Sequence, residues 1–167
     1  MTSDSDGVTV PVLQDAVAAG AIADHLRRYR QLPAEAHLWD ATPSGGFKNT
    51  PTLLLTTTGR RTGRQLTWPL IYGRDGDNYA IVASKGGAPE HPSWYLNLLA
   101  TPQIEVQVAE RKFSATPRTA VGEERRRIWQ IMCEIYPPYD HYQTLTTREI
   151  PVVVLEPKTS SETTQRL

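Results

Sequence analysis

LLLTTTGRRTGRQLTWPLIYGRDGDNYAIVA, residues 53–83, is the stretch that decides the fold of this chain. It contains three short segments rich in leucine, β-branched and aromatic residues, at 53–58, 65–72 and 79–83, a composition that favours strands. Glycines bracket the turn between the first two segments, and the turn before the third contains Asp-Gly, a strong signal for a tight hairpin. The stretch therefore predicts three consecutive strands joined by hairpins.

Patterns on either side of this stretch predict further strands and helices. Alternating or β-branched residues predict three more strands, at 104–108, 113–119 and 150–155. Apolar residues at helical spacing, and prolines that open or end helices, predict helices at 13–31, 92–99, 123–135 and 139–147. About six strands without βαβ alternation indicate an α+β fold whose antiparallel sheet curls toward a barrel.

Pro69 lies inside the second predicted strand. Proline has no N–H to donate to a neighbouring strand, so it is confined to edge strands and bulges. We therefore expect an edge position or a bulge there, with exposed backbone that is able to face a ligand.

Composition excludes several classes of protein and site. Lys and Arg together number 18, as do Asp and Glu, so no net charge attracts nucleic acid. Cys133 is the single cysteine and the four histidines have no recurrent spacing, so neither a disulfide nor a metal site is expected. The chain has none of the common phosphate-loop, dinucleotide-binding or esterase motifs. The lone cysteine and the acidic start of the chain predict a cytoplasmic protein.

Basic residues gather in the turn between the first two predicted strands. Arg60, Arg61 and Arg64 lie in TTTGRRTGR, residues 56–64, and Lys85 follows the third strand. Guanidinium groups and turn N–H groups together suit a phosphate or carboxylate. The alternative is a solvated hairpin turn, which is what most basic turns are.

The order of motifs resembles the deazaflavin-dependent nitroreductase and quinone reductase family, which uses reduced coenzyme F-420 (F420). TTTGRRTGR is followed by ASKGGAPEHPSWYLN at 83–97, then by EIYPPYDHYQ and REIPVVVLEP. The resemblance covers residues 52–157 and implies a split β-barrel of the flavin-binding type, with mostly antiparallel strands and flanking helices. It implies a deazaflavin-binding domain at 51–157, preceded by a helix and wrapping segment at 1–50 and followed by a flexible tail at 158–167.

The resemblance also assigns residues to the cofactor site. It implies that the arginines bind the phosphate and glutamyl tail, that Ala83 and Ser84 lie near the ring edge, and that Trp94 walls the cofactor. The full set of implied cofactor residues is Arg60, Arg61, Arg64, Pro69, Leu70, Ile71, Ala83, Ser84, Lys85, Gly86, Gly87, Trp94 and Asn97. From local sequence alone, the glycine pair also fits an ordinary surface loop, and Trp94 also fits the core.

Tyr136, Tyr139 and Tyr142 are spaced by three, which on one helix spreads them over a limited arc. The resemblance implies that they bound the acceptor site, where a phenol donates a hydrogen bond to an oxygen that gains charge. With Ser84, they are the expected catalytic residues. Ordinary packing of amphipathic tyrosines is the alternative.

The implied reaction is hydride transfer from reduced F420 to a planar, electron-poor acceptor: a quinone, an enone or a nitroaromatic. One alternative is an oxidoreductase of the same fold that binds flavin mononucleotide (FMN), and another is a non-catalytic deazaflavin carrier. A homodimer is expected by analogy with similar barrels. Leu13 and Val17 give the first helix an apolar face, which motivates the hypothesis that it contacts the cytoplasmic face of a membrane when the acceptor is a lipid quinone.

Overall fold

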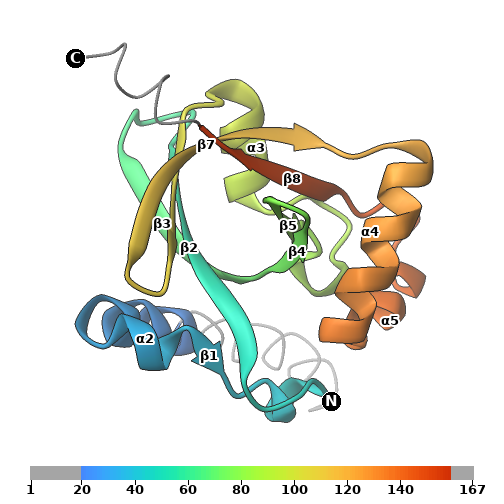
Figure 1. Cartoon of the computed structure of the whole chain (residues 1–167). Coiled ribbons are helices and arrows are strands. Elements are labelled where there is room, and N and C mark those ends of the chain that lie inside the picture. Colours follow the sequence, from blue (N-terminus) through green and yellow to red (C-terminus); the bar gives the residue numbers. More distant parts are fainter. Residues whose placement is uncertain (1–19, 159–167) are drawn as a thin grey trace, which may run out of the picture.

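Eight strands, all paired antiparallel, form one curled sheet in the computed structural model of the chain, which describes residues 20–158 (Figure 1). Their order across the sheet is β1-β2-β6-β7-β8-β5-β4, and β3 pairs with β2 outside this path. The strands are β1 (Leu38–Trp39), β2 (Thr50–Thr58), β3 (Gln65–Ile71), β4 (Gly73–Asp75), β5 (Asn78–Val82), β6 (Ile104–Val108), β7 (Arg111–Thr119) and β8 (Val152–Pro157).

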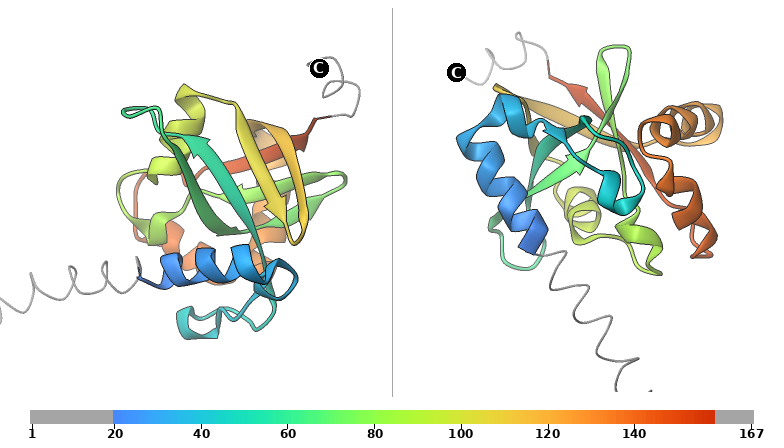
Figure 2. Two further views of the ribbon diagram at one scale, coloured as in Figure 1. Left: turned by 90° about the vertical axis from the view of Figure 1, so that its left-hand side faces the viewer. Right: turned by 90° about the horizontal axis from the view of Figure 1, so that it is seen from below.

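Helices flank the sheet on several sides (Figures 1 and 2). Residues 20–31 are helical and lie beneath the β2–β3 and β6–β7 hairpins, whereas two later helices cover the opposite end of the sheet. The named helices are α2 (Pro33–Ala36), η1 (Thr42–Ser44), η2 (Lys85–Gly87), α3 (Ser93–Ala100), α4 (Gly122–Ile135) and α5 (Pro138–Thr144). This confirms the predicted α+β class. The sheet has two more strands than the six expected, because β1 and β4 are too short to leave a pattern in the sequence.

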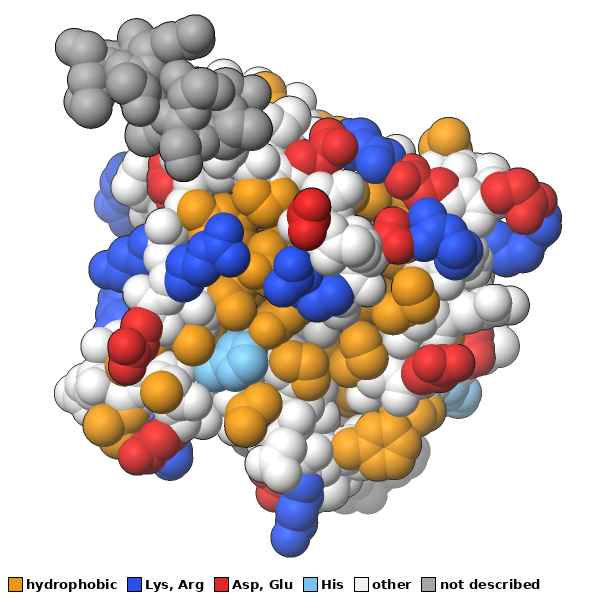
Figure 3. All heavy atoms as spheres, in the orientation of Figure 1, with side chains coloured by type: hydrophobic (Ala, Val, Ile, Leu, Met, Phe, Trp, Pro, Cys, Tyr) orange, Lys and Arg blue, Asp and Glu red, His pale blue; other side chains and the backbone are white. Residues whose placement is uncertain are grey.

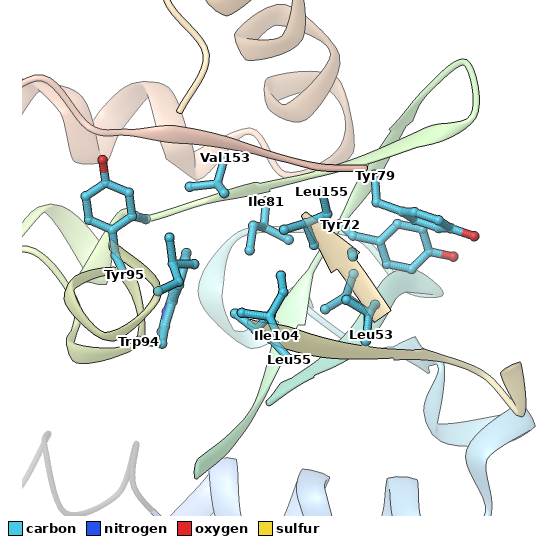
Figure 4. Close-up of a cluster of buried hydrophobic side chains, with 14 residues drawn as sticks. Leu53, Leu55, Tyr72, Tyr79, Ile81, Trp94, Tyr95, Ile104, Val153 and Leu155 are labelled. Atoms are coloured by element: carbon cyan, nitrogen blue, oxygen red, sulfur yellow. The ribbon is translucent and has the colours of Figure 1, made fainter. Parts of the chain in front are cut away.

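The curled sheet separates two hydrophobic cores. The inner core is enclosed by the curl and contains Leu53, Ile81 and Leu155, with Tyr72 and Tyr79 at one end (Figure 4). The outer core lies between β5, β8, α4 and α5, and contains side chains such as Val82, Val154, Ile128 and Met132. Successive strand residues point to opposite faces, so β5 and β8, which lie next to each other, supply buried side chains to both cores.

β3 is an edge strand, as Pro69 predicts. It pairs with β2 and with no other strand of residues 20–158, and Pro69 lies opposite Leu54. The Asp-Gly turn is confirmed as well: it joins β4 to β5, and Gly76 there has a φ of 60°. The unpaired edge leaves backbone groups of β3 without a neighbouring strand among the described residues.

Tyr29 fixes the N-terminal helix to the barrel. Its hydroxyl donates to the carbonyl of Thr52 at 2.9 Å and accepts from the backbone N–H of Ala109 at 2.8 Å. One buried side chain thus ties the helix to β2 and to the β6–β7 turn. Leu13 and Val17, which suggested a membrane contact, lie outside the described residues. Within residues 20–158, no helix combines the length and apolar character that crossing a membrane requires.

Candidate functional site

The β2–β3 turn and helix α3 bring Arg60 and Asn97 together. Asn97 is 2% exposed, and its side-chain oxygen accepts from the backbone N–H of Arg60 at 3.1 Å and from Nη1 of Arg60 at 2.8 Å. The resemblance implied that both residues contact the cofactor, and the structure places them in contact across 37 positions of the chain. The turn is therefore anchored to α3 through Arg60.

The turn presents positive charge to solvent. Arg60, Arg61 and Arg64 are all exposed, and none of them forms an ion pair with a carboxylate anywhere in residues 20–158. A cluster of cations without counter-charges is a ready site for a polyanion, because charged hydrogen bonds to phosphate or carboxylate are the strong ones.

The η2 loop has an unusual backbone. Ser84 is right-handed helical, whereas Lys85, Gly86 and Gly87 have φ values of 46°, 63° and 85°. A right-handed residue followed by a left-handed one turns successive N–H groups toward the same point, which is an anion-binding arrangement. Lys85 is exposed and its Nζ lies 3.2 Å from Oε1 of Glu90. Its charge is partly neutralised, unlike those of the turn arginines.

Gly87 is required where it stands. A Cβ at this position would lie 2.7 Å from the carbonyl oxygen of Tyr142 and 3.0 Å from Cβ of Leu145. Gly86, by contrast, has nothing within 4 Å of the position of a Cβ. The loop is therefore pressed against α5 at one glycine and open at the other.

Arg148 holds the η2 loop from behind, a role that the sequence did not reveal. Its guanidinium donates to the carbonyls of Ser84 at 2.8 Å, Ala88 at 2.9 Å and Ala83 at 3.3 Å, and to Nδ1 of His91 at 3.0 Å. Burial lowers the pKa of Arg148. One side chain thus fixes both ends of the segment that was expected to cradle the cofactor.

A cavity of about 320 Å³ lies beside the outer face of β3. Pro69 and Ile71 line it, as expected for residues along a ring, but the side chain of Leu70 packs against the inner core instead. The remaining lining residues come from the N-terminal helix, β1, η1 and β2: Ala21, Ile22, His25, Trp39, Ser44 and Thr52.

His25 is the ionisable group in the lining of this cavity. Its ring stacks on Trp39 with centroids 5.8 Å apart, and its Nε2 lies 3.0 Å from the carbonyl oxygen of Ala36. Burial lowers the pKa of His25, and the charge of Arg28 lowers it further. Because a neutral imidazole is favoured, the cavity has little charge of its own.

The three tyrosines do not share one helix, in agreement with the separate helices predicted at 123–135 and 139–147, so their spacing by three does not place them on one helical face. Tyr136 caps the C-terminal end of α4, whereas Tyr139 and Tyr142 belong to α5. Pro137 and Pro138 separate the two helices. The rings still pack together, with centroids 4.9 to 6.3 Å apart. The prolines thus fold the tyrosines into a cluster rather than a stripe.

The hydroxyls of Tyr136 and Tyr142 connect this cluster to the cavity. They lie 2.9 Å apart, and the Tyr136 hydroxyl donates to Oγ of Ser44, a cavity-lining residue, at 2.9 Å. Viewed from below, the segment carrying Ser44 lies between the N-terminal helix and helices α4 and α5 (Figure 2, right). Tyr142 is half-buried, and burial raises its pKa, so it stays protonated.

Two expected ligand contacts are buried in protein. Tyr139 is 4% exposed in the outer core, where burial raises its pKa, and Trp94 is 5% exposed in the inner core. Neither presents much surface to a ligand, so contact of either with cofactor or acceptor stays a prediction that the geometry does not favour. Ala83 is also fully buried; its N–H donates to the carbonyl of Pro151 at 2.9 Å and its carbonyl accepts from Arg148, so its contact with the ring edge stays a prediction that the geometry does not favour.

Comparison with known proteins gives consistent matches. Residues 25–157 match the family described as F420H(2)-dependent quinone reductase. A curated F420H(2)-dependent quinone reductase of Mycobacterium tuberculosis is 48% identical over 108 residues, which are 63% of this chain and 72% of that protein.

Solved structures agree with the sequence matches. A structure described as an F420-H2 dependent reductase is 46% identical with a TM-score of 0.60, and the match covers 64% of this chain and 94% of that one. Another, described as a domain-swapped dimer, is 38% identical with a TM-score of 0.62, covering 86% and 98%. A heme storage protein of Vibrio cholerae, 17% identical over 65% of this chain and 82% of its own with a TM-score of 0.51, shares the fold alone.

These matches confirm the split β-barrel, the F420-dependent reductase activity and the F420 cofactor, and none of those described above points to FMN. The chain belongs to the F420H(2)-dependent quinone reductase family.

Proposed function

We propose that this reductase passes a hydride from reduced F420 to a quinone, or to an enone or nitroaromatic of similar shape. We further propose that the β2–β3 turn, the η2 loop and the cavity beside β3 form its site. The observation that carries the proposal is the arrangement of charge and apolar surface along one edge strand: cations without carboxylate partners at one end of β3, and a nearly uncharged cavity at the other.

The length of β3 suits an elongated cofactor. The strand has seven residues, which span roughly 20 Å at about 3.3 Å per residue. The arginines precede its first residue, and Pro69 and Ile71 lie near its last. A ring in the cavity and a tail that reaches the turn therefore fit the two ends of one strand.

The residues present fit the anionic parts of F420. Arg60, Arg61 and Arg64 supply exposed guanidinium groups, and the left-handed η2 backbone supplies N–H groups beside Lys85. A charged hydrogen bond contributes about 1.5 to 3 kcal/mol in a sheltered place and much less at an open rim. Several exposed contacts are therefore needed, and the turn provides them.

The cavity favours a planar, uncharged ring system. Ala21, Ile22, Trp39, Pro69 and Ile71 give it apolar walls, and burial keeps His25 neutral. Ligand pockets commonly measure about 300 to 1,000 Å³, so this cavity takes one ring system, and we place the second planar molecule at its mouth. No protein nucleophile is needed for this reaction.

When bound, reduced F420 supplies the hydride. The chain positions the acceptor and offers hydrogen-bond donors to the oxygen that gains negative charge. We assign this donation to Tyr142, which stays protonated and which exchanges its hydrogen bond to the Tyr136 hydroxyl for one to the acceptor. Ser84, which is partly exposed and whose carbonyl is held by Arg148, is assigned to the ring edge.

We also propose that the protein is a homodimer, because a solved relative that covers most of this chain is described as a domain-swapped dimer. A cytoplasmic location remains a prediction from the sequence. The membrane contact suggested for the first helix rests on residues outside the described part of the chain.

The test is a pair of titrations followed by turnover. We expect purified protein to bind oxidised F420 much more tightly than FMN, and to oxidise reduced F420 when menadione is added. The arginine track predicts that F420 affinity falls as salt increases, because exposed charge contacts are screened. Equal affinity for F420 and FMN, or binding that is indifferent to salt, would contradict the proposed tail site.

A further inference from the structure

A second group of cationic and phenolic side chains lies at one end of the inner core, apart from the residues proposed for F420. The hydroxyls of Tyr72 and Tyr79 point out of the same end of this core (Figure 4). Both rings are buried, at 7% and 2% exposure, and they pack edge to face with centroids 5.5 Å apart. The rings close the end of the barrel, and their polar ends form its outer surface.

Two arginines stack on aromatic rings at this end of the core, one on Tyr79 and one on Phe113, which packs against Tyr79. The guanidinium of Arg74 lies 4.1 Å from the centre of the Tyr79 ring, and that of Arg111 lies 4.9 Å from the centre of the Phe113 ring. Arg111 also donates to the Tyr79 hydroxyl at 3.4 Å. Stacking on aromatic faces orients a guanidinium while leaving N–H groups at its edge free to bind. Arg74 and Arg111 come from different hairpins, and Tyr79 brings them together.

This positive charge has no counter-charge in the described part of the chain. Neither Arg74 nor Arg111 forms an ion pair with a carboxylate of residues 20–158. The Tyr79 hydroxyl accepts from Arg111, and no acceptor for its own proton is found among the same residues. Figure 3 shows basic side chains and a histidine around hydrophobic surface near the centre of this face. Arg74 donates to the carbonyl of Gly76 at 3.3 Å, but neither guanidinium has a carboxylate partner among residues 20–158.

His37 completes the group. Its Nε2 and the Tyr72 hydroxyl share a hydrogen bond of 2.6 Å, and the two rings are tilted with centroids 5.6 Å apart. This contact fixes the Tyr72 hydroxyl beside Tyr79. The Tyr72 side chain belongs to the inner core and that of its neighbour Ile71 packs on the outer core, so this group and the cavity beside β3 lie on opposite faces of the strand.

We propose that Arg74, Arg111 and Tyr79 form a second binding site, which takes the oxyanion group of a small molecule, a phosphate or a carboxylate. The two guanidinium groups supply the charge, and the Tyr79 hydroxyl supplies a directed hydrogen bond. The site is shallow because the buried rings fill the space beneath it, so it binds an anionic group rather than a whole ring system. It does not depend on the proposed F420 site.

The simplest competing explanation is that the arginines only cover aromatic surface. Long arginine stems do this commonly, and any pair of cations attracts anions weakly. The two explanations differ over Tyr79, because general attraction does not need its hydroxyl. They also differ over which arginines matter, because general attraction predicts that the loss of any exposed arginine weakens anion binding equally.

The test is a titration of the full-length protein with inorganic phosphate at low ionic strength, followed through the Nε–H resonances of arginine by nuclear magnetic resonance. A parallel titration with succinate distinguishes a phosphate site from a carboxylate site by which anion binds more tightly. We expect saturable shifts at Arg74 and Arg111. Arg74→Gln and Arg111→Gln should each weaken binding about fivefold, and Tyr79→Phe about threefold.

Arg126→Gln is the matched control. Arg126 is an exposed arginine on α4 that pairs with Glu123, so its loss removes the same charge far from Tyr79 in the chain. Unchanged binding in this variant and weaker binding in the other three would support the site. A loss of the same size in Arg126→Gln, an unchanged affinity in Tyr79→Phe, or shifts that never saturate would overturn it.

Discussion

The β2–β3 turn and the η2 loop are assigned to the same anionic cofactor, yet the protein supports them in opposite ways. The turn is exposed. Among the described residues, Asn97 is the one side chain of another element that forms hydrogen bonds with it. The η2 loop is pressed against α5 at Gly87 and held by four hydrogen bonds from Arg148. A long flexible tail tolerates an adaptable partner, whereas a ring that must meet an acceptor at reacting distance needs a fixed one.

The largest expected effect comes from replacing Gly87. Gly87→Ala should destabilise the protein by about 3 kcal/mol, because a left-handed alanine is strained and its Cβ would contact the Tyr142 carbonyl. Gly86→Ala, which adds the same methyl in open space at a similar φ, should cost about 1 kcal/mol. Urea unfolding measures both. Equal losses would show that the loop is not pressed against α5.

Arg148→Met should have the next largest effect. It removes all four hydrogen bonds to the loop, and we expect a loss of about 2 kcal/mol in stability together with roughly tenfold weaker F420 binding. Arg148→Lys keeps the charge but loses the planar fork, so it should bind F420 with intermediate affinity. Titration of F420 fluorescence measures this. Wild-type affinity in Arg148→Met would separate the loop from the cofactor.

Tyr142→Phe tests whether α5 contributes chemistry as well as support for the loop. We expect kcat with menadione to fall about tenfold with little change in F420 affinity, because only the donor to the developing charge is lost. Tyr139→Phe is the matched control, since Tyr139 is buried in the outer core. If Tyr139→Phe lowers kcat more than Tyr142→Phe does, the assignment of donors is wrong.

Arg60→Ala tests the exposed half of the comparison. F420 affinity should fall about fivefold at low salt and by less at high salt, because the contact is open to solvent. Stability should fall by less than in Arg148→Met, because the variant loses one side-chain hydrogen bond to Asn97 and keeps the backbone one. Lys85→Ala should have a smaller effect, since Lys85 is already paired with Glu90. Binding measured at two salt concentrations checks both variants, and a salt-independent loss would argue against a tail contact.

The smallest expected effect is a pH dependence of the local stability of the η2 loop. Burial lowers the pKa of His91 below its ordinary value of 6.5, and the Arg148 charge adds to this. A lowered pKa in the folded state means that this contribution to stability is present above 6.5 and is lost as the pH falls below it. Protection of the Gly87 and Ala88 amides against hydrogen exchange should therefore fall below pH 6.5. His91→Asn should remove most of that dependence.

The fold was predictable from sequence because its signals are local. Alternating strands, the Asp-Gly turn and the edge position of Pro69 each depend on a few neighbouring residues. Arg148 was not predictable, because its partners are backbone carbonyls and a histidine 57 to 65 positions away. The burial of Tyr139 was missed for a related reason: the break at Pro137 and Pro138 was predicted, but Tyr139 is buried in a core that includes side chains of β5, which is distant in the chain.

The hydrogen bonds of Tyr29 also constrain the order of assembly during translation. Its hydroxyl accepts from an amide 80 positions further along the chain, so the N-terminal helix cannot complete its docking until the β6–β7 turn has left the ribosome. Contacts of such high sequence separation also form slowly in refolding. Until residue 109 has been made, the helix wall of the cavity beside β3 therefore lacks one of the hydrogen bonds that hold it against the barrel.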